Sequence, residues 1–209
     1  MEHLKSPEQI DLDREPGEPP PDAASRGLRK VLVLDCDDTL WGGVVGEEGL
    51  DGLELGSSSS RGALYTEVQH LILALQRQGV ILALNSKNDA VDVAEVFAKH
   101  PEMILAEEHL ATKRVNWHDK AENLRSMAQE LGLGLDSFVF LDDSDFEVGG
   151  MRARLPQVVT LQVPKTLADY PDLVRRARSL FFPLVDSPEG GQGAPRGGAE
   201  LRQQQEREA

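Results

Sequence analysis

Short apolar runs recur along the chain, and each one leads directly into polar residues. Three runs are continuous and rich in β-branched or aromatic side chains, which is typical of strands buried on both faces: Val31–Leu34, Val80–Leu84 and Phe138–Leu141. Between them, apolar residues recur at helical spacing over about 58–78, 90–99 and 120–131. This alternation predicts an α/β fold in which a parallel sheet carries helices on both faces.

The remaining chain contains weaker signals. Residues 158–161 favour one more strand, and residues 167–180 favour a closing helix interrupted at Pro171. The glycine-rich stretch 41–56, just after the first strand, predicts a tight hairpin or short flap. That stretch is too short for an independent lid, so we expect no large cap domain.

Composition predicts one folded unit between two tails. Residues 1–27 are acidic and proline-rich, and residues 187–209 are rich in glycine and polar side chains, so we expect both to be disordered. The folded catalytic unit is then 28–186. A chain of 209 residues with 40% apolar content is long enough for one domain with a core of its own.

Charge and cysteine content exclude several classes of function. The formal net charge is −14 and no basic cluster is interleaved with aromatic residues, which disfavours DNA or RNA as a partner. No apolar run is long enough to span a membrane and no secretory signal is apparent, so we expect a cytoplasmic protein without a membrane partner. A single cysteine, Cys36, excludes an internal disulfide and any multi-cysteine metal site.

Carboxylate pairs follow two of the predicted strands. Asp35 and Asp37 come after the first strand, and Asp142 and Asp143 come at the end of the third. Because ligands bind at the carboxyl ends of parallel strands, we expect these pairs to meet at one edge of the sheet. Hard oxygen ligands at one site favour Mg²⁺, and an aspartate there can attack phosphorus to form an aspartyl phosphate.

The other candidate residues have two interpretations each. Ser86 is either a ligand for a phosphoryl oxygen or an N-cap of the following helix. Lys120 either holds a carboxylate and a phosphate together or is an exposed helix charge. Trp41 either shapes the substrate pocket or packs in the core. Further candidates for substrate or phosphate contact lie beside them: Thr39, Lys87 and Asn88.

Four ordered motifs carry a family resemblance. The segments VLVLDCDDTLWGGVVGEEGL, LNSKND, VNWHDKAENL and FVFLDDSDFE resemble the motifs of the haloacid dehalogenase superfamily. The Thr-Leu-Trp-Gly-Gly continuation and the Asn-Trp before the motif lysine are similar to its FkbH-like branch. The resemblance covers about 30–180 and implies a three-layer, Rossmann-like fold.

The resemblance also implies a role for each motif residue. Asp35 would be the nucleophile and a metal ligand, and Asp37 the general acid/base that also reaches the metal through its backbone carbonyl. Ser86 and Lys120 would bind the phosphoryl group, and the pair 142–143 would complete the Mg²⁺ site. Two departures from the branch are Asp38, where asparagine is usual, and Ser144-Asp145, which replaces Asn-Pro.

The FkbH-like resemblance implies a specific activity. Proteins of that branch dephosphorylate 1,3-bisphosphoglycerate and transfer the glyceryl unit to an acyl carrier protein in polyketide biosynthesis. The expected partners are therefore a carrier protein and a phosphorylated three-carbon substrate. Cys36 would serve as the thiol nucleophile that forms a glyceryl thioester.

Other interpretations remain open. Strand alternation turns residue 36 away from residues 35 and 37, so Cys36 is alternatively a core side chain, and the neighbouring carboxylates would raise the pKa of its thiol. The protein would then be a simple phosphatase that hydrolyses a small-molecule or protein phosphate ester through Asp35. A third interpretation is a catalytically silent binding module.

Overall fold

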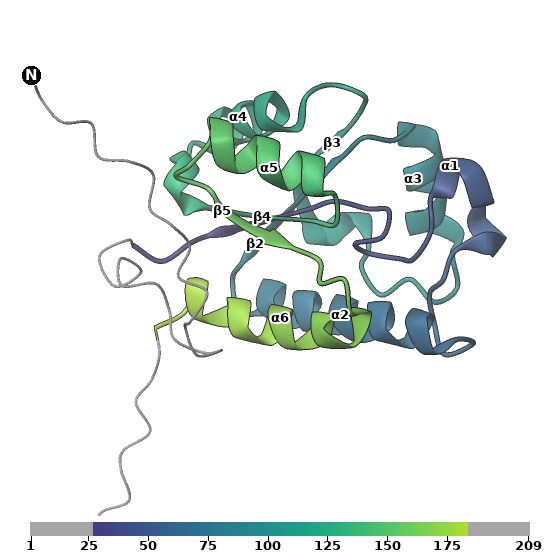
Figure 1. The fold of residues 1–209 in the computed structure, drawn as a ribbon. Helices are drawn as coiled ribbons and strands as arrows, with labels where there is room; N and C mark the ends of the chain where they lie inside the picture. Colours follow the sequence, from purple (N-terminus) through teal and green to yellow (C-terminus); the bar gives the residue numbers. More distant parts are fainter. Residues whose placement is uncertain (1–26, 184–209) are drawn as a thin grey trace, which may run out of the picture.

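A five-stranded parallel sheet lies between two layers of helices in the computed structural model, which describes residues 27–183 (Figure 1). The strand order is β3-β2-β1-β4-β5. The strands are β1 (Val31–Leu34), β2 (Ile81–Ser86), β3 (Leu110–Val115), β4 (Phe138–Asp142) and β5 (Val159–Gln162). The helices are α1 (Val45–Glu48), α2 (Ser60–Arg77), α3 (Ala90–Lys99), α4 (Lys120–Leu131), α5 (Asp145–Arg154) and α6 (Tyr170–Ala177). This α/β architecture confirms the predicted fold class.

Alternation along the strands divides the core into two parts. On β1, Leu32 and Leu34 face one cluster, which also includes residues of α2, α3 and α6. Val31 and Val33 face the other cluster, which includes residues of α4 and α5. Figure 1 shows the corresponding layers, with α4 and α5 on one side of the sheet and α2 and α6 on the other. Both faces of β1 are therefore buried, as its continuous apolar run predicts.

The chain reverses its direction across the sheet next to β1. It runs outward from β1 through β2 to β3, and then crosses to β4 on the other side of β1 before reaching β5. β1 pairs with β4 in parallel, with Leu34 opposite Leu141. The carboxyl ends of β1 and β4 thus flank a topological switch point, where parallel sheets commonly bind ligands.

Two elements differ from the expectations for the weaker segments. The stretch 41–56 is not a simple hairpin: it contains α1 and the 3₁₀ turn Leu50–Gly52, closed by an antiparallel bridge between Gly42 and Glu54. The closing helix is not interrupted at Pro171, because α6 begins at Tyr170 and proline occupies the first turn, where no backbone donor is needed. A 3₁₀ turn, Leu167–Asp169, precedes it.

Two other elements were not predicted at all. They are the edge strand β3 and the helix α5. The remaining short 3₁₀ turns are Glu107–His109, Leu135–Ser137 and Arg178–Leu180. Nearly all of the two expected disordered tails lies outside the described residues. Within residues 27–183, no helix combines the length and apolar character needed to cross a bilayer.

Candidate active site

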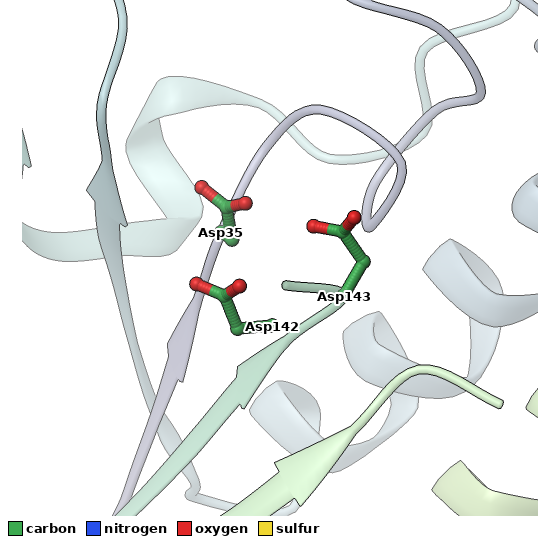
Figure 2. A group of neighbouring side chains, drawn as sticks. All are labelled: Asp35, Asp142 and Asp143. Atoms are coloured by element: carbon green, nitrogen blue, oxygen red, sulfur yellow. The ribbon is translucent and has the colours of Figure 1, made fainter. Parts of the chain in front are cut away.

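Three carboxylates meet at the carboxyl ends of β1 and β4. Asp35 follows β1 directly, Asp142 is the last residue of β4, and Asp143 is the next residue along the chain. One carboxylate oxygen from each lies within 4.8 Å of the others. Figure 2 shows the three side chains gathered at this edge of the sheet. Three of the four carboxylates that were expected at one edge of the sheet therefore lie together.

Backbone contacts hold the three carboxylates in place. The amide of Asp35 donates to the carbonyl of Leu141 at 3.0 Å, which fixes the end of β1 against β4. The amide of Ser144 donates to Asp142 Oδ1 at 2.9 Å. The Ser144 hydroxyl in turn caps α5 by accepting from the Glu147 amide. The turn from β4 into α5 therefore orients Asp142.

Lys120 is the cation that faces these carboxylates. Its Nζ lies 2.9 Å from Asp35 Oδ1 and 2.6 Å from Asp142 Oδ2, and the lysine is only 3% exposed. Burial alone would lower the pKa of Lys120, but the two carboxylates outweigh burial and raise the pKa above its usual value. Asp119 caps α4 by accepting from two backbone amides, which places Lys120 in the first helical turn. Lys120 is therefore a buried charge partner and not an exposed helix charge.

One lysine does not balance three carboxylates. Burial, followed by repulsion from Asp35 and Asp142, raises the pKa of Asp143 to about 7. Burial and the charge of Asp35 also raise the pKa of Asp142, against the opposing effect of Lys120. A divalent cation would relieve this repulsion, and three carboxylates supply the oxygen donors that Mg²⁺ prefers. The donor set of Asp35, Asp142 and Asp143 thus fits a magnesium ion.

Asp37 has a different environment from the other three aspartates. Its Oδ1 accepts from Trp41 Nε1 at 2.9 Å and from the Val45 amide at 3.2 Å, and its Oδ2 accepts from Asn88 Nδ2 at 2.9 Å. Burial nevertheless raises its pKa above the ordinary value, although these three donors oppose the shift. The Asp37 carboxylate lies outside the group of three carboxylates described above. Such a carboxyl suits proton transfer.

Trp41 and Asn88 therefore contact Asp37, one through an indole and one through an amide. Trp41 is fully buried, and its ring meets Phe97 edge to face at 6.3 Å between centroids. It packs in the core and orients Asp37. Asn88 also donates to Ser86 Oγ at 3.3 Å, so it links the β2–α3 loop to both residues.

Ser86 and Cys36 lie on the core side of the site. Ser86 is 1% exposed at the end of β2 and does not cap α3, whose N-cap is Asp89. Cys36 is fully buried in the same cluster as Leu32 and Leu34, so the alternation of β1 continues through it. Burial, and then the charge of Asp35, raise the pKa of the Cys36 thiol well above its ordinary value, while a hydrogen bond with Ser86 opposes this. The thiol is therefore held in its neutral form.

Of the two remaining predicted residues, Lys87 is paired within the protein, whereas the buried hydroxyl of Thr39 has no hydrogen-bond partner among the described residues. Thr39 is fully buried, and its carbonyl accepts from the Tyr170 hydroxyl at 3.1 Å. Lys87 pairs with Glu147 of α5 at 2.7 Å and lies 5.8 Å from the centre of the Phe146 ring. Lys87 therefore bridges the β2–α3 loop to the first turn of α5.

Sequence reasoning missed two buried asparagines behind the site. Asn85 precedes Ser86 and is fully buried, and Asn123 lies one turn after Lys120 and is 6% exposed. Asn85 Nδ2 donates to the Lys120 carbonyl at 2.8 Å, and Asn123 Nδ2 donates to Asn85 Oδ1 at 3.1 Å. The sequence signal that could have identified Asn85 is a polar residue directly after the apolar run Val80–Leu84.

Among solved structures, the chain is similar to the N-terminal part of a Bacteroides fragilis protein that contains a phosphatase domain, in complex with Mg. The two share 36% sequence identity with a TM-score of 0.72 over 77% of this chain. The match spans 43% of that chain, so this protein corresponds to less than half of its length. No protein-family model and no curated protein matches this sequence.

Two further solved structures are similar at much lower identity. One is a haloacid dehalogenase family enzyme from Bacteroides thetaiotaomicron in complex with magnesium and inorganic phosphate, at 12% identity and a TM-score of 0.43 over 65% of this chain and 94% of that one. The other is the cobalt-bound deoxy-D-mannose-octulosonate 8-phosphate phosphatase of Haemophilus influenzae, at 14% identity and a TM-score of 0.45 over 72% and 90%.

The parallel sheet between two layers of helices is the architecture that the resemblance of the four ordered motifs to the haloacid dehalogenase superfamily implies. The acidic cluster is consistent with magnesium binding, and the similar Bacteroides fragilis domain was solved with Mg. The narrower FkbH-like assignment rests on the motif resemblance alone.

Proposed function

We propose that this protein is a Mg²⁺-dependent phosphatase that hydrolyses a phosphate ester through an aspartyl phosphate on Asp35. The observation that carries the proposal is the meeting of Asp35, Asp142 and Asp143 within 4.8 Å, with Lys120 bridging the first two. Two carboxylates that belong to different strands, and a buried lysine from a helix, are costly to bring together without a ligand to bind. Figure 2 shows the carboxylates from which the metal site would be built.

In the first step, an Asp35 carboxylate oxygen attacks phosphorus and the bond from phosphorus to the leaving oxygen breaks. Asp37 donates its proton to that leaving oxygen. The raised pKa of Asp37, caused by burial, favours this role, because it makes the proton-carrying form more accessible than in an exposed aspartate. The products of this step are the free alcohol and the phosphorylated Asp35.

In the second step, water attacks the phosphorus of the aspartyl phosphate. Asp37, now ionised, takes a proton from that water, and the bond between phosphorus and the Asp35 oxygen breaks. Ser86 and Lys120 would hold the phosphoryl oxygens through a hydroxyl and an ammonium. Mg²⁺ held by Asp35, Asp142 and Asp143 would neutralise charge on the transferred group.

The test uses the full chain and a generic aryl phosphate. Wild type should release phosphate only with Mg²⁺, and Asp35→Asn should lower kcat by roughly 10³-fold or more, since it removes the nucleophile. Asp136→Asn is the matched control, because Asp136 is an exposed aspartate that precedes the first residue of β4, at the end of the strand away from Asp142. Acid quenching should trap a phosphorylated wild type and no phosphorylated Asp35→Asn. Turnover undiminished in Asp35→Asn, or independent of Mg²⁺, would refute the proposal.

Glyceryl transfer to an acyl carrier protein is the second candidate, and it rests on the FkbH-like motifs. In this route the thiolate of Cys36 would attack the acyl carbon of 1,3-bisphosphoglycerate, break the bond to the acyl phosphate and leave a 3-phosphoglyceryl thioester. Hydrolysis of the remaining phosphate ester at the carboxylate site would then give the glyceryl thioester. The full burial of Cys36 and the raised pKa of its thiol favour the hydrolytic route over this one. Transfer would need the residues that bury Cys36 to move before substrate could reach the sulfur.

Intact-mass measurement separates the two routes. The protein would be incubated with 1,3-bisphosphoglycerate, Mg²⁺ and a carrier protein, alongside Cys36→Ala. Glyceryl mass on wild type and on the carrier, absent with Cys36→Ala although aryl phosphate is still hydrolysed, would establish the thioester route. Carrier loading that is equal with both proteins would exclude Cys36 as the acyl carrier.

A further inference from the structure

Two buried asparagines, a half-buried one and neighbouring backbone groups form a continuous hydrogen-bond network between β2 and the start of α4. Asn85 Nδ2 donates to the carbonyl of Lys120 at 2.8 Å, while Asn85 Oδ1 accepts from Asn123 Nδ2 at 3.1 Å. Asn123 Nδ2 also donates to Asn116 Oδ1 at 3.0 Å, and the Asn116 amide donates to the Ser86 carbonyl at 3.1 Å. The network therefore runs from Lys120 back to the residue after Asn85.

The position of Asn85 in this network is unusual for a polar side chain. Asn85 follows four apolar residues of β2 and precedes Ser86, and it has no exposed surface. An unbonded amide in such a place would cost free energy, whereas an apolar side chain would fill the space without that requirement. Both atoms of the Asn85 amide are bonded, one to α4 at Lys120 and one to α4 at Asn123.

These two bonds fix the main chain of the residue that carries the site's buried cation. Lys120 and Asn123 are three residues apart on one helix, so they present the same face to β2. A lysine side chain is long and flexible, and its ammonium reaches Asp35 and Asp142 together only from a defined backbone position. Asn85 supplies a contact that ties that position to the strand beside β1.

From this geometry we infer that Asn85 is a positioning residue, which sets the place of the Lys120 ammonium between Asp35 and Asp142. The inference rests on the proposed function for its kinetic consequence. Asn85 would touch neither substrate nor metal, and it would act only through Lys120. Hydrogen-bond partners of this kind, one contact removed from the reacting groups, commonly change activity or metal affinity by about 10–100-fold when they are lost.

The experiment is a double-mutant cycle with Asn85→Leu, Lys120→Met and the double variant, each as the full chain. Thr112→Val is the matched control, because Thr112 is a buried β3 residue whose hydroxyl donates to Glu130 near the other end of α4. Asn85→Leu should lower kcat on an aryl phosphate by about 10–100-fold with a smaller change in KM. In the Lys120→Met background the same substitution should change kcat little. Thr112→Val should leave kcat near the wild-type value.

Mg²⁺ titration by calorimetry gives a second measure that needs no turnover. Displacing the ammonium from Asp35 and Asp142 removes a competing positive charge, so Asn85→Leu should tighten Mg²⁺ binding, and should not do so once Lys120 is methionine. Equal effects of Asn85→Leu on Mg²⁺ affinity in both backgrounds would overturn the inference, whatever the kinetics. Absence of turnover in wild type would instead refute the phosphatase proposal. The Mg²⁺ titrations of the same variants would still decide the role of Asn85.

Discussion

Replacing Lys120 with methionine removes the cation between two buried carboxylates while keeping the aliphatic stem. Asp142 is fully buried and Asp35 is 6% exposed, so neither carboxylate can turn to solvent for compensation. Removing one member of such a buried pair typically costs about 3–5 kcal/mol, because the remaining charge is left unpaired. We therefore expect Lys120→Met to lower the free energy of unfolding by about that amount without metal.

The same substitution should respond strongly to magnesium. At 100 times its dissociation constant, Mg²⁺ adds about 2.7 kcal/mol to the stability of any protein that binds it only when folded. The variant has one positive charge fewer at the carboxylates, so it should bind Mg²⁺ more tightly than wild type and gain more from a given concentration. The stability difference between the two proteins should therefore shrink when EDTA is replaced by Mg²⁺.

Urea unfolding with and without Mg²⁺ measures both effects. Lys99→Met is the control, because Lys99 forms an exposed pair with Glu95 at the i,i+4 spacing and should cost no more than about 0.5 kcal/mol. If Lys120→Met lowers the free energy of unfolding by no more than Lys99→Met does, the contacts of Lys120 with Asp35 and Asp142 are not strongly coupled buried ion pairs. If Mg²⁺ leaves the stability difference between Lys120→Met and wild type unchanged, Asp35, Asp142 and Asp143 do not share a metal.

Three further predictions concern single residues near the site. Because the pKa of Asp143 is about 7 in the folded protein, above its unfolded value, the metal-free protein should lose stability as the pH rises from about 4 to 7. The affinity for Mg²⁺ should fall below pH 7, because protons compete with the metal for Asp143. Urea unfolding and calorimetry should show that both trends are weaker in Asp143→Asn. Trp41→Phe removes a hydrogen-bond donor to ionised Asp37, so the pKa of Asp37 should rise further and the alkaline limb of the pH profile of kcat/KM should move to higher pH. An unmoved limb would exclude Asp37 as the group that titrates. Asp38 has a φ of 48°, in the left-handed region, so Asp38→Val should cost about 1–2 kcal/mol more in thermal unfolding than Asp38→Asn, and equal costs would argue against backbone strain there.

The buried strands and their carboxylates were predictable because each rule involved is local. A continuous apolar run identifies a strand buried on both faces, and parallel strands place their following residues at one edge. The edge strand β3 gave no such signal: it contains Lys113 and Arg114, and only Thr112 in it is buried. The helix α5 contains adjacent glycines, Gly149 and Gly150, which weaken helix propensity and break the apolar periodicity.

Side-chain roles within the site were less predictable than its location. The sequence alone could not separate the two interpretations of Lys120 or Trp41, because burial depends on which elements pack above them. The structure buries both and gives each a carboxylate partner: Asp35 and Asp142 for Lys120, and Asp37 for Trp41. Asn85 could not be identified as a contact of Lys120, because 35 residues separate them along the chain.

The pairing of β1 with β4 gives the site an all-or-none character. Asp35 and Asp142 are brought together by two central strands in one register, with Leu34 opposite Leu141. A slip of one position would turn every β1 side chain to the opposite face and carry Asp35 away from Asp142. A fragment lacking either strand cannot assemble the carboxylate group, so binding of the metal would also report that the middle of the sheet has folded correctly.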